Sequence, residues 1–543
     1  MNASTAAAAL LLLATWPAPS TRAQPRPEEA DLFAAPAVPA PPTGQPPAPA
    51  ATAPGAASAT PPGGDARGDA RGDELLGESS GPRATGLISA EREDWLRLGG
   101  LAYLRATTTW TREVPPSGWS FSAPSLLDVY LDARPNDRVR AFALGRLQYN
   151  PAAGGAPSSS FSAIDSTTTA SMAPAAATTR GILDQLWINF DAGRTVFITA
   201  GKQHVKWGTG RFWNPTDYLH PTRRDPLTQY DDRSGVTIVK AHLPWEKRGW
   251  NLHAIALLED LAGGLQPDLS VTTVSTLGQV GAGARAEVVL GNLELAVDGV
   301  VQRGHRPRFG VDGSFPLWEL DLHFEVALRR GRDLPRWEEV PGATSAEAIM
   351  SRYRLRQFDG LTPAAVVGAE WTWKYSDQDT LTLGGEYSYD ASGYGSADIY
   401  PFLLAVSILP RYAPLVADLA IPDQRPAFIP FYLAKQYVGL YAYLPAPGSW
   451  NNTRVTLSAL GSLTDGSGVV RLDHSVLLNT YLRIETYLAG HLGNLGGEFR
   501  FGATVPSQYI GNTRPPDSVP LSTPAISISP PVLDFGVALR VTL

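Results

Sequence analysis

Apolar and polar residues alternate over segments of about ten residues from Trp95 to the C-terminus, with turn-forming residues between the segments. Successive side chains of a strand point to opposite faces, so this alternation gives each segment one apolar and one polar face. About ten residues is also the length at which a tilted strand crosses a bilayer. The pattern therefore predicts membrane-spanning strands, with apolar side chains toward lipid and polar side chains toward a lumen.

The last segment shows the alternation most clearly. Its polar face carries small and charged residues, among them Asp534 and Arg540, and its apolar face carries Leu533, Phe535, Val537, Leu539, Val541 and Leu543. A strand that ends on the last residue resembles the C-terminal signal of outer-membrane barrels. The residues from Phe535 to Leu543 are therefore expected to be recognised by the barrel-assembly machinery, although Leu543 departs from the usual aromatic terminal residue.

Upstream hairpins share one layout, with tight turns at one end and long connections at the other. Tight turns join 126–134 to 138–149, 182–191 to 195–205, 236–244 to 250–258, 286–290 to 293–302, and 365–375 to 380–389. Gly, Asn and Asp supply the positive φ that such turns need. The long connections are 150–181, 207–234, 330–363 and 390–433. This layout predicts an all-β, antiparallel up-and-down transmembrane barrel of about 18 strands, with 16 as the alternative count.

A soluble β-sandwich or propeller would show the same alternation, with the apolar face inward. Strands of about ten residues exceed the usual five or six of soluble sheets. The expected lumen face also carries repeated charges, at Arg97, Arg140, Glu287 and Arg540. Two aromatic pairs, Trp245 with Trp250 and Tyr443 with Trp450, flank tight turns where an interfacial girdle is expected. These features favour the membrane barrel.

The N-terminal part of the chain has a different composition. Residues 1–23 form an apolar core and a small-x-small site, which predicts a signal peptide. Residues 24–83 are rich in Pro, Ala and Gly and are expected to be a disordered periplasmic segment, followed by the barrel from 84 to 543. The chain has no Cys, only 18% charged residues and no long basic block, so neither disulfides nor a nucleic-acid partner is expected.

One dense motif, GKQHVKWGTGRFWNPTDYLHPTRRDPL at 201–227, falls in the connection 207–234, which is expected to be the third loop at the end of the barrel that carries the long connections. In trimeric porins the third loop folds into the barrel, where opposed charges set a transverse field. The residues expected at such a constriction are Trp207, Arg211, Trp213, Asp217, Arg223, Arg224 and Asp225. In the alternative interpretation, the loop packs on the barrel wall or rim and its Arg–Asp pairs are internal salt bridges.

Catalysis and metal binding are weakly supported. His204, His220 and Asp217 lie near one another in sequence, but neither HExxH nor a nucleophile elbow occurs. A histidine in a loop is more often structural or solvated. We therefore expect neither an enzyme nor a cofactor or bound metal.

The GKQ-x-V-x-WG…FWNPTD pattern, the LTDGSG stretch at 463–468 and the GGEFR stretch at 496–500 resemble a broad group of uncharacterised proteobacterial porin-like barrels. The resemblance covers roughly Trp95 to Leu543. It implies an outer-membrane barrel and names no substrate.

The connection 390–433 is unusually apolar, so it is expected to fold over or into the lumen as a short helix or plug. A protein partner outside the cell is the alternative.

The first functional hypothesis is a porin-like channel for passive diffusion of small hydrophilic solutes. Its partners would be outer-membrane lipid and lipopolysaccharide, and fold analogy suggests a homotrimer. The alternatives are a barrel that exports or anchors a surface polysaccharide, an outer-membrane enzyme, and a soluble all-β binding protein.

Overall fold

The computed structural model describes residues 95–542, apart from 113, 152–178, 221–222, 229, 232, 260–275, 332–335, 343–351, 357–358, 404–427, 429 and 506–525. The predicted signal peptide at 1–23, the segment 24–83 and the terminal Leu543 lie outside this described part.

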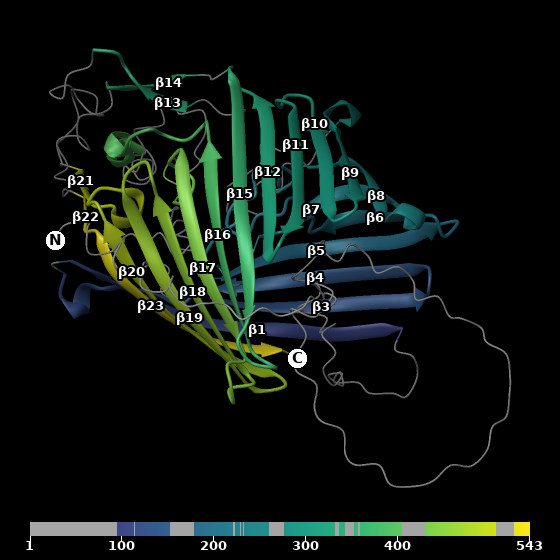
Figure 1. Cartoon of the computed structure of the whole chain (residues 1–543), viewed down its shortest axis with the longest axis horizontal. Coiled ribbons are helices and arrows are strands. Elements are labelled where there is room, and N and C mark those ends of the chain that lie inside the picture. Colours follow the sequence, from purple (N-terminus) through teal and green to yellow (C-terminus); the bar gives the residue numbers. More distant parts are fainter. Residues whose placement is uncertain are drawn as a thin grey trace, which may run out of the picture. The chain divides into compact units, whose positions relative to one another are not determined.

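Eighteen antiparallel strands form one closed sheet, as the sequence predicted (Figure 1). They are β1 (Leu96–Thr111), β3 (Ser125–Asn136), β4 (Val139–Tyr149), β5 (Thr179–Ala192), β6 (Val196–Gln203), β7 (Val236–Trp245), β8 (Trp250–Leu257), β9 (Gly281–Leu290), β10 (Leu293–Val301), β11 (Arg308–Leu317), β12 (Leu320–Arg330), β15 (Leu361–Lys374), β16 (Thr380–Asp390), β17 (Gln436–Pro445), β18 (Thr453–Ser462), β19 (Ser467–Asn479), β20 (Leu482–Gly493) and β23 (Pro531–Thr542). Each strand pairs with the next along the chain, and β23 pairs with both β20 and β1.

The remaining elements are short. A small strand, β2 (Ser120–Ser122), pairs with the end of β1, and two separate two-stranded pieces are formed by β13 (Arg336–Glu339) with β14 (Tyr353–Arg356) and by β21 (Ala503–Val505) with β22 (Ile526–Ile528). Single 3-10 turns occur at η3 (Pro116–Gly118), η4 (Glu246–Arg248), η5 (Leu277–Gln279), η6 (Ala397–Ile399) and η8 (Glu498–Arg500). No helix in the described part of the chain is long and apolar enough to cross a membrane.

The two ends of the barrel differ as the sequence predicted. At one end the turns are tight, for example Gly291 and Asn292 between β9 and β10, where Gly291 has a φ of 66°. At the other end the connections are long, including 150–178, 204–235, 331–360 and 391–435. Two connections at this long-loop end, 302–307 and 463–466, are nevertheless short. Short turns on the periplasmic side and long loops outside are the layout of outer-membrane barrels.

The outward face of the barrel is apolar. In β23, Phe535 and Val537 are exposed whereas Asp534 and Arg540 are buried on the lumen side, so this strand faces as its alternation predicted. Leu539 and Val541 are half-buried. Exposed aromatic side chains gather near both ends of the strands: Trp245, Trp318, Trp373, Tyr375, Trp450 and Tyr481 near the tight turns, and Trp110, Phe121, Tyr149, Phe309 and Tyr387 near the long loops. An apolar band between two aromatic girdles defines a membrane-spanning barrel of the outer-membrane type.

A charge on the outward face should destabilise the barrel according to its depth in the membrane. Val297 lies at the middle of β10 and Val301 at its long-loop end, and both are about half exposed. Val297→Arg is expected to lower the free energy of unfolding by about 2–4 kcal/mol, and Val301→Arg by about 1 kcal/mol or less. Denaturant titration in lipid vesicles, followed by tryptophan fluorescence, measures both. Equal costs at the two positions would contradict the placement of the apolar band.

Candidate functional site

The connection between β6 and β7, residues 204–235, is the third at the long-loop end and is called loop 3 below. It lies inside the barrel, because its residues contact lumen-facing side chains on strands far from β6 and β7. The motif singled out in the sequence is therefore the part of the chain that enters the lumen.

On one side, loop 3 is bound to β12 and β16 through two buried carboxylates. Glu325 of β12 accepts hydrogen bonds from the backbone N–H of Gly210 at 2.5 Å and from the Thr216 hydroxyl at 2.9 Å. Glu386 of β16 accepts from the backbone N–H groups of Arg211 and Phe212, the second at 2.8 Å. Both carboxylates belong to the lumen face, since Val326 and Tyr387, the residues that follow them in the chain, are exposed on the outside.

Aromatic packing on β17 completes this contact. Trp213 stacks on Tyr437 with ring centroids 5.5 Å apart, and its indole N–H donates to the carbonyl of Phe431 at 3.2 Å. Phe212 meets Tyr441 edge-on at 5.8 Å. Loop 3 thus shares one apolar cluster with β15, β17, β18, β19 and β20.

On the other side, the end of loop 3 is bound to β3, β4 and β5. A β-bulge in β5 puts Asp184 on the lumen side next to Gln185, and both are fully buried. Asp184 accepts from the backbone N–H of Gly235 at 3.3 Å and lies 3.2 Å from His204 Nε2. Tyr230 donates its hydroxyl to Asp128 of β3 at 2.7 Å.

Arg146 links these groups. It forms two 2.7 Å hydrogen bonds to Asp128 and lies 3.9 Å from the Asp184 carboxylate. Because loop 3 is bound to β3–β5 and also to β12, β16 and β17, it bridges the lumen.

Four cationic side chains of loop 3 form what we call the basic rim: Lys206, Arg211, Arg223 and Arg224. Three of them are exposed and Arg224 is half-buried. The Arg211 guanidinium lies 3.9 Å from the centre of the Tyr441 ring. Arg224 Nη1 donates to the backbone carbonyl of Arg211 at 3.5 Å, so the two limbs of loop 3 bring these residues together.

Arg223 extends the rim toward β16. Its guanidinium lies 4.7 Å from the centre of the Tyr432 ring and 3.7 Å from Asp390. Tyr432 in turn donates its hydroxyl to the carbonyl of Arg224 at 2.5 Å. Both tyrosines therefore support arginines of the rim.

The acidic residues of loop 3 that the structure describes have partners outside the basic rim. Asp217 and Asp231 both pair with Arg233, at 3.0 and 2.7 Å. Asp225 accepts from the backbone N–H of Leu227 at 2.9 Å. Within the described residues, no carboxylate lies within ion-pair distance of Lys206, Arg211 or Arg224. The loop therefore presents positive charge although its sequence contains both signs.

The residues that the sequence singled out fall into three groups. Arg211, Arg223 and Arg224 are brought together in the basic rim. Trp207 and Trp213 are almost fully buried in packing, and Trp207 meets Tyr218 edge-on. Asp217 pairs with Arg233 of the loop, and Asp225 accepts a hydrogen bond from the backbone of Leu227.

Sequence reasoning missed Lys206, although it lies inside the motif. It also missed the supporting Glu325, Glu386, Tyr432 and Tyr441, whose only sequence signal is a lumen-facing position in a strand or a place in another loop.

The environment of the rim shifts the pKa of Lys206. Desolvation inside the barrel, with the nearby Arg224 charge, lowers the pKa of Lys206 to about 8. Burial and Arg233 lower the pKa of His220 to about 4, which keeps its ring neutral at neutral pH. In the part of the chain that the structure describes, no group of three or more His, Asp or Glu side chains is arranged to hold a metal ion.

The apolar connection 391–435 packs against loop 3 at Phe212 and Trp213. Phe431 and Ala434 join the cluster around Trp213, and η6 is a single 3-10 turn in the same connection. Residues of this connection also pack with Tyr353 of β14 and with Phe501 and Ile528 of the 494–530 connection. The rest of the predicted plug, 404–427, lies outside the described residues.

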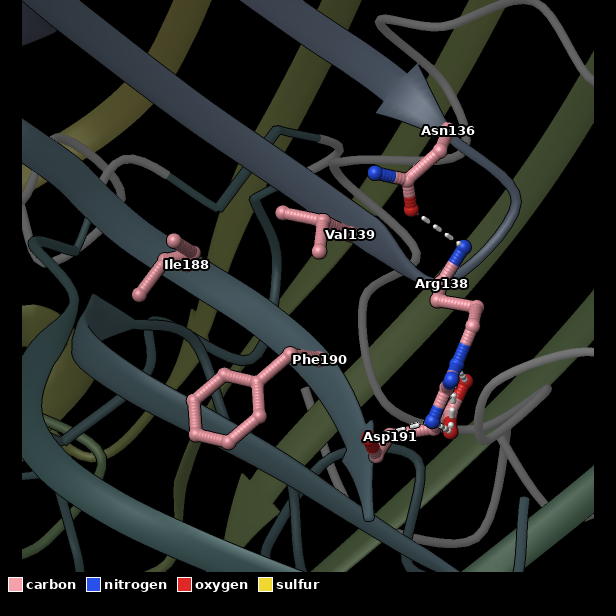
Figure 2. A pocket seen from close by; sticks show the side chains of 6 residues that line it. All are labelled: Asn136, Arg138, Val139, Ile188, Phe190 and Asp191. Atoms are coloured by element: carbon pink, nitrogen blue, oxygen red, sulfur yellow. Dashed lines mark hydrogen bonds and ion pairs between the residues drawn. The ribbon is translucent and has the colours of Figure 1, made fainter. Parts of the chain in front are cut away.

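A hollow of about 440 Å³ lies at the tight-turn end of β3, β4 and β5 (Figure 2). Arg138 and Asp191 pair at 2.7 Å on one side of it, and Ile188 and Phe190 line the other. Both apolar residues belong to the exposed outer face, so this hollow is not part of the lumen.

No protein-family model matches the sequence, and no curated protein sequence matches it. Solved structures with a similar fold include the outer-membrane protein OpdK of Pseudomonas aeruginosa (9% identity, 82% of this chain and 98% of that chain covered, TM-score 0.44). Others are OccK2 (OpdF) of Pseudomonas aeruginosa in complex with glucuronate (11%, 82% and 98%, 0.44) and a BenF-like porin of Pseudomonas fluorescens Pf-5 (11%, 84% and 100%, 0.44).

Loop 3 should be sensitive to any side chain at Gly210. A Cβ there would lie 2.1 Å from the Trp213 carbonyl, whereas a Cβ at Gly145 of β4 would meet no atom within 4 Å. Gly210→Ala is expected to cost about 1–3 kcal/mol of local stability, and so to speed amide hydrogen exchange of the 207–216 backbone roughly tenfold or more. Exchange measured by mass spectrometry tests this. Unchanged exchange in Gly210→Ala, or an equal rise in the Gly145→Ala control, would contradict the packing described.

Proposed function

We propose that the protein is a passive diffusion channel for small hydrophilic solutes, with loop 3 as its constriction. The observation that carries the proposal is that loop 3 bridges the lumen from β3–β5 to β12, β16 and β17. A segment fixed in this way narrows the path along the barrel axis and determines which side chains a solute meets.

The basic rim gives the channel a preference for anions. Lys206, Arg211 and Arg224 form no ion pair with any described carboxylate, and Asp217 and Asp231 of the loop are both paired with Arg233. An exposed charge a few Å from a passing ion contributes up to about 1 kcal/mol in water. Several such charges at one level favour anions over cations.

The proposal places the barrel in the outer membrane with lipopolysaccharide around it, and assigns it no enzymatic activity. It further takes 1–23 as a signal peptide and 24–83 as a periplasmic segment, with the strand around Phe535 and Val537 as the signal for the barrel-assembly machinery. Three copies would form a homotrimer, each with its own loop 3.

Single-channel recording in a planar bilayer tests the channel. The purified protein should give stable open steps and prefer anions in a salt gradient, and Arg223→Ala with Arg224→Ala should lower the anion-to-cation permeability ratio roughly twofold to tenfold. Arg138→Ala removes one positive charge at the hollow outside the lumen and should leave the ratio unchanged. A correctly folded barrel that gives no open steps would refute the channel.

The anion preference should fall as the pH rises through about 8. The pKa of Lys206 is lowered to about 8, and a lysine is charged below its pKa, so the rim loses one positive charge above that pH. The permeability ratio should therefore decrease between about pH 7 and pH 9, and this step should be absent in Lys206→Met. Recording reversal potentials across this range checks the prediction, and an identical step in Lys206→Met would assign the titration to another group.

A further inference from the structure

Two glutamates on the barrel wall have an unusual role. Glu325 and Glu386 are almost fully buried and bind loop 3 largely through its backbone N–H groups. The two oxygens of Glu386 accept from consecutive residues, Arg211 and Phe212, and the same carboxylate lies 2.9 Å from His323 Nε2. Hydrogen bonds to an ionised carboxylate are roughly twice as strong as those between neutral groups.

The motif WGTGRFWNPT at 207–216 is shaped to receive these carboxylates. A Cβ at Gly208 would lie 2.4 Å from Glu325 Oε1, and Gly208 has a φ of 92°, so a larger residue would displace the carboxylate and strain the backbone. Gly210 donates its N–H to the same oxygen, and Thr216 donates both its hydroxyl and its backbone N–H to the other. Gly208, Gly210 and Thr216 therefore all allow the loop backbone to approach Glu325 closely.

Glu386 fixes the position of the basic rim through its hydrogen bond to the Arg211 backbone. It binds the Arg211 backbone, while the Arg211 side chain lies over Tyr441 and the Arg211 carbonyl accepts from Arg224. Tyr441 is itself held on the wall by a hydrogen bond to Glu370. A shift of the loop at Arg211 would therefore displace two of the four rim cations.

We infer that Glu325 and Glu386 are positioning residues for ion selectivity: they fix loop 3 so that the basic rim faces the permeation path. This inference rests on the proposed channel function. Positioning and simple electrostatics predict opposite changes in anion preference when one of these glutamates is replaced. Loss of a negative charge near the rim should by itself strengthen anion preference, whereas loss of the positioning bond should weaken it.

Glu386→Gln and Glu386→Asp separate the two effects. The first removes the charge, and the second keeps the charge but shortens the side chain by one methylene. Positioning predicts that both variants lower the anion-to-cation permeability ratio at least twofold and increase open-channel noise. A higher ratio in Glu386→Gln, with wild-type behaviour in Glu386→Asp, would overturn the inference.

Asp132→Asn is the matched control. Asp132 is a buried lumen carboxylate of β3 that pairs with Arg134 and Arg140 at the tight-turn end, away from loop 3. Its loss should leave the permeability ratio unchanged or higher. An equal fall in this control would show that the effect is general to buried lumen carboxylates and would also overturn the inference.

A second measurement does not depend on conductance. Amide hydrogen exchange at Arg211 and Phe212 should rise roughly tenfold or more in Glu386→Gln, and not in Asp132→Asn. If the wild-type barrel gave no conductance or no anion preference, the proposed function would fail, and exchange would still decide whether Glu386 positions the loop. Unchanged exchange at these two amides would overturn the inference in either case.

Thr216→Val provides a milder variant, should the glutamate variants fail to assemble. It removes one donor to Glu325 and keeps both carboxylates and the shape of the side chain. It should raise exchange in 207–216 less than Glu386→Gln while the barrel keeps its heat-modifiable mobility on gels. No rise at all would contradict the role of Glu325.

Discussion

The ladder between β1 and β23 is the constraint on which the rest of the structure depends. Lipid offers no hydrogen-bond partner to a backbone, so a sheet in the bilayer must have no free edge. The first and last strands meet in antiparallel register from Leu101 opposite Thr542 to Thr109 opposite Asp534, which closes the sheet. Closure then fixes the alternation, since every outward residue meets lipid and every inward residue meets the lumen. The apolar band and the charged interior both follow from it.

The same requirement applies to irregular backbone inside the barrel. Loop 3 has neither strand nor helix in its described residues, so its N–H groups need partners other than a ladder. Three side-chain carboxylates of the barrel wall accept hydrogen bonds from these N–H groups: Glu325, Glu386 and Asp184. Glu498 acts similarly for the 391–435 connection, since it accepts from the backbone of Phe431 and Leu433, and burial raises its pKa to about 8. Many interior charges are thus structural, and only those left exposed are available to a solute.

The difference between contacts set by the bilayer and contacts made inside the lumen explains what the sequence could predict. Period-two alternation revealed the strands and their outward faces because the bilayer imposes it on every strand, and tight turns located the hairpins. The loop 3 motif was evident from its density of aromatic and charged residues. The roles inside it were not, because the decisive partners are distant: Glu325 lies 115 residues from Gly210, and Glu386 lies 174 from Phe212. Trp213, which the sequence placed at the constriction, stacks on Tyr437 of β17, a partner that is distant in the sequence. The bulge that turns Asp184 inward leaves no clear signal in the alternation.

The separation between loop 3 and its anchors also orders the assembly of the barrel in time. Loop 3 follows β6, the fifth of the eighteen barrel strands, yet its partners on β12 and β16 come much later in the chain. Until β12 and β16 have taken their places in the sheet, the segment has no wall to bind and its backbone must stay hydrated. Only after β12 and β16 have joined the sheet can Glu325 and Glu386 accept hydrogen bonds from the N–H groups of loop 3. The interior of this barrel is therefore completed after its wall, and an incomplete sheet holds an unfilled lumen.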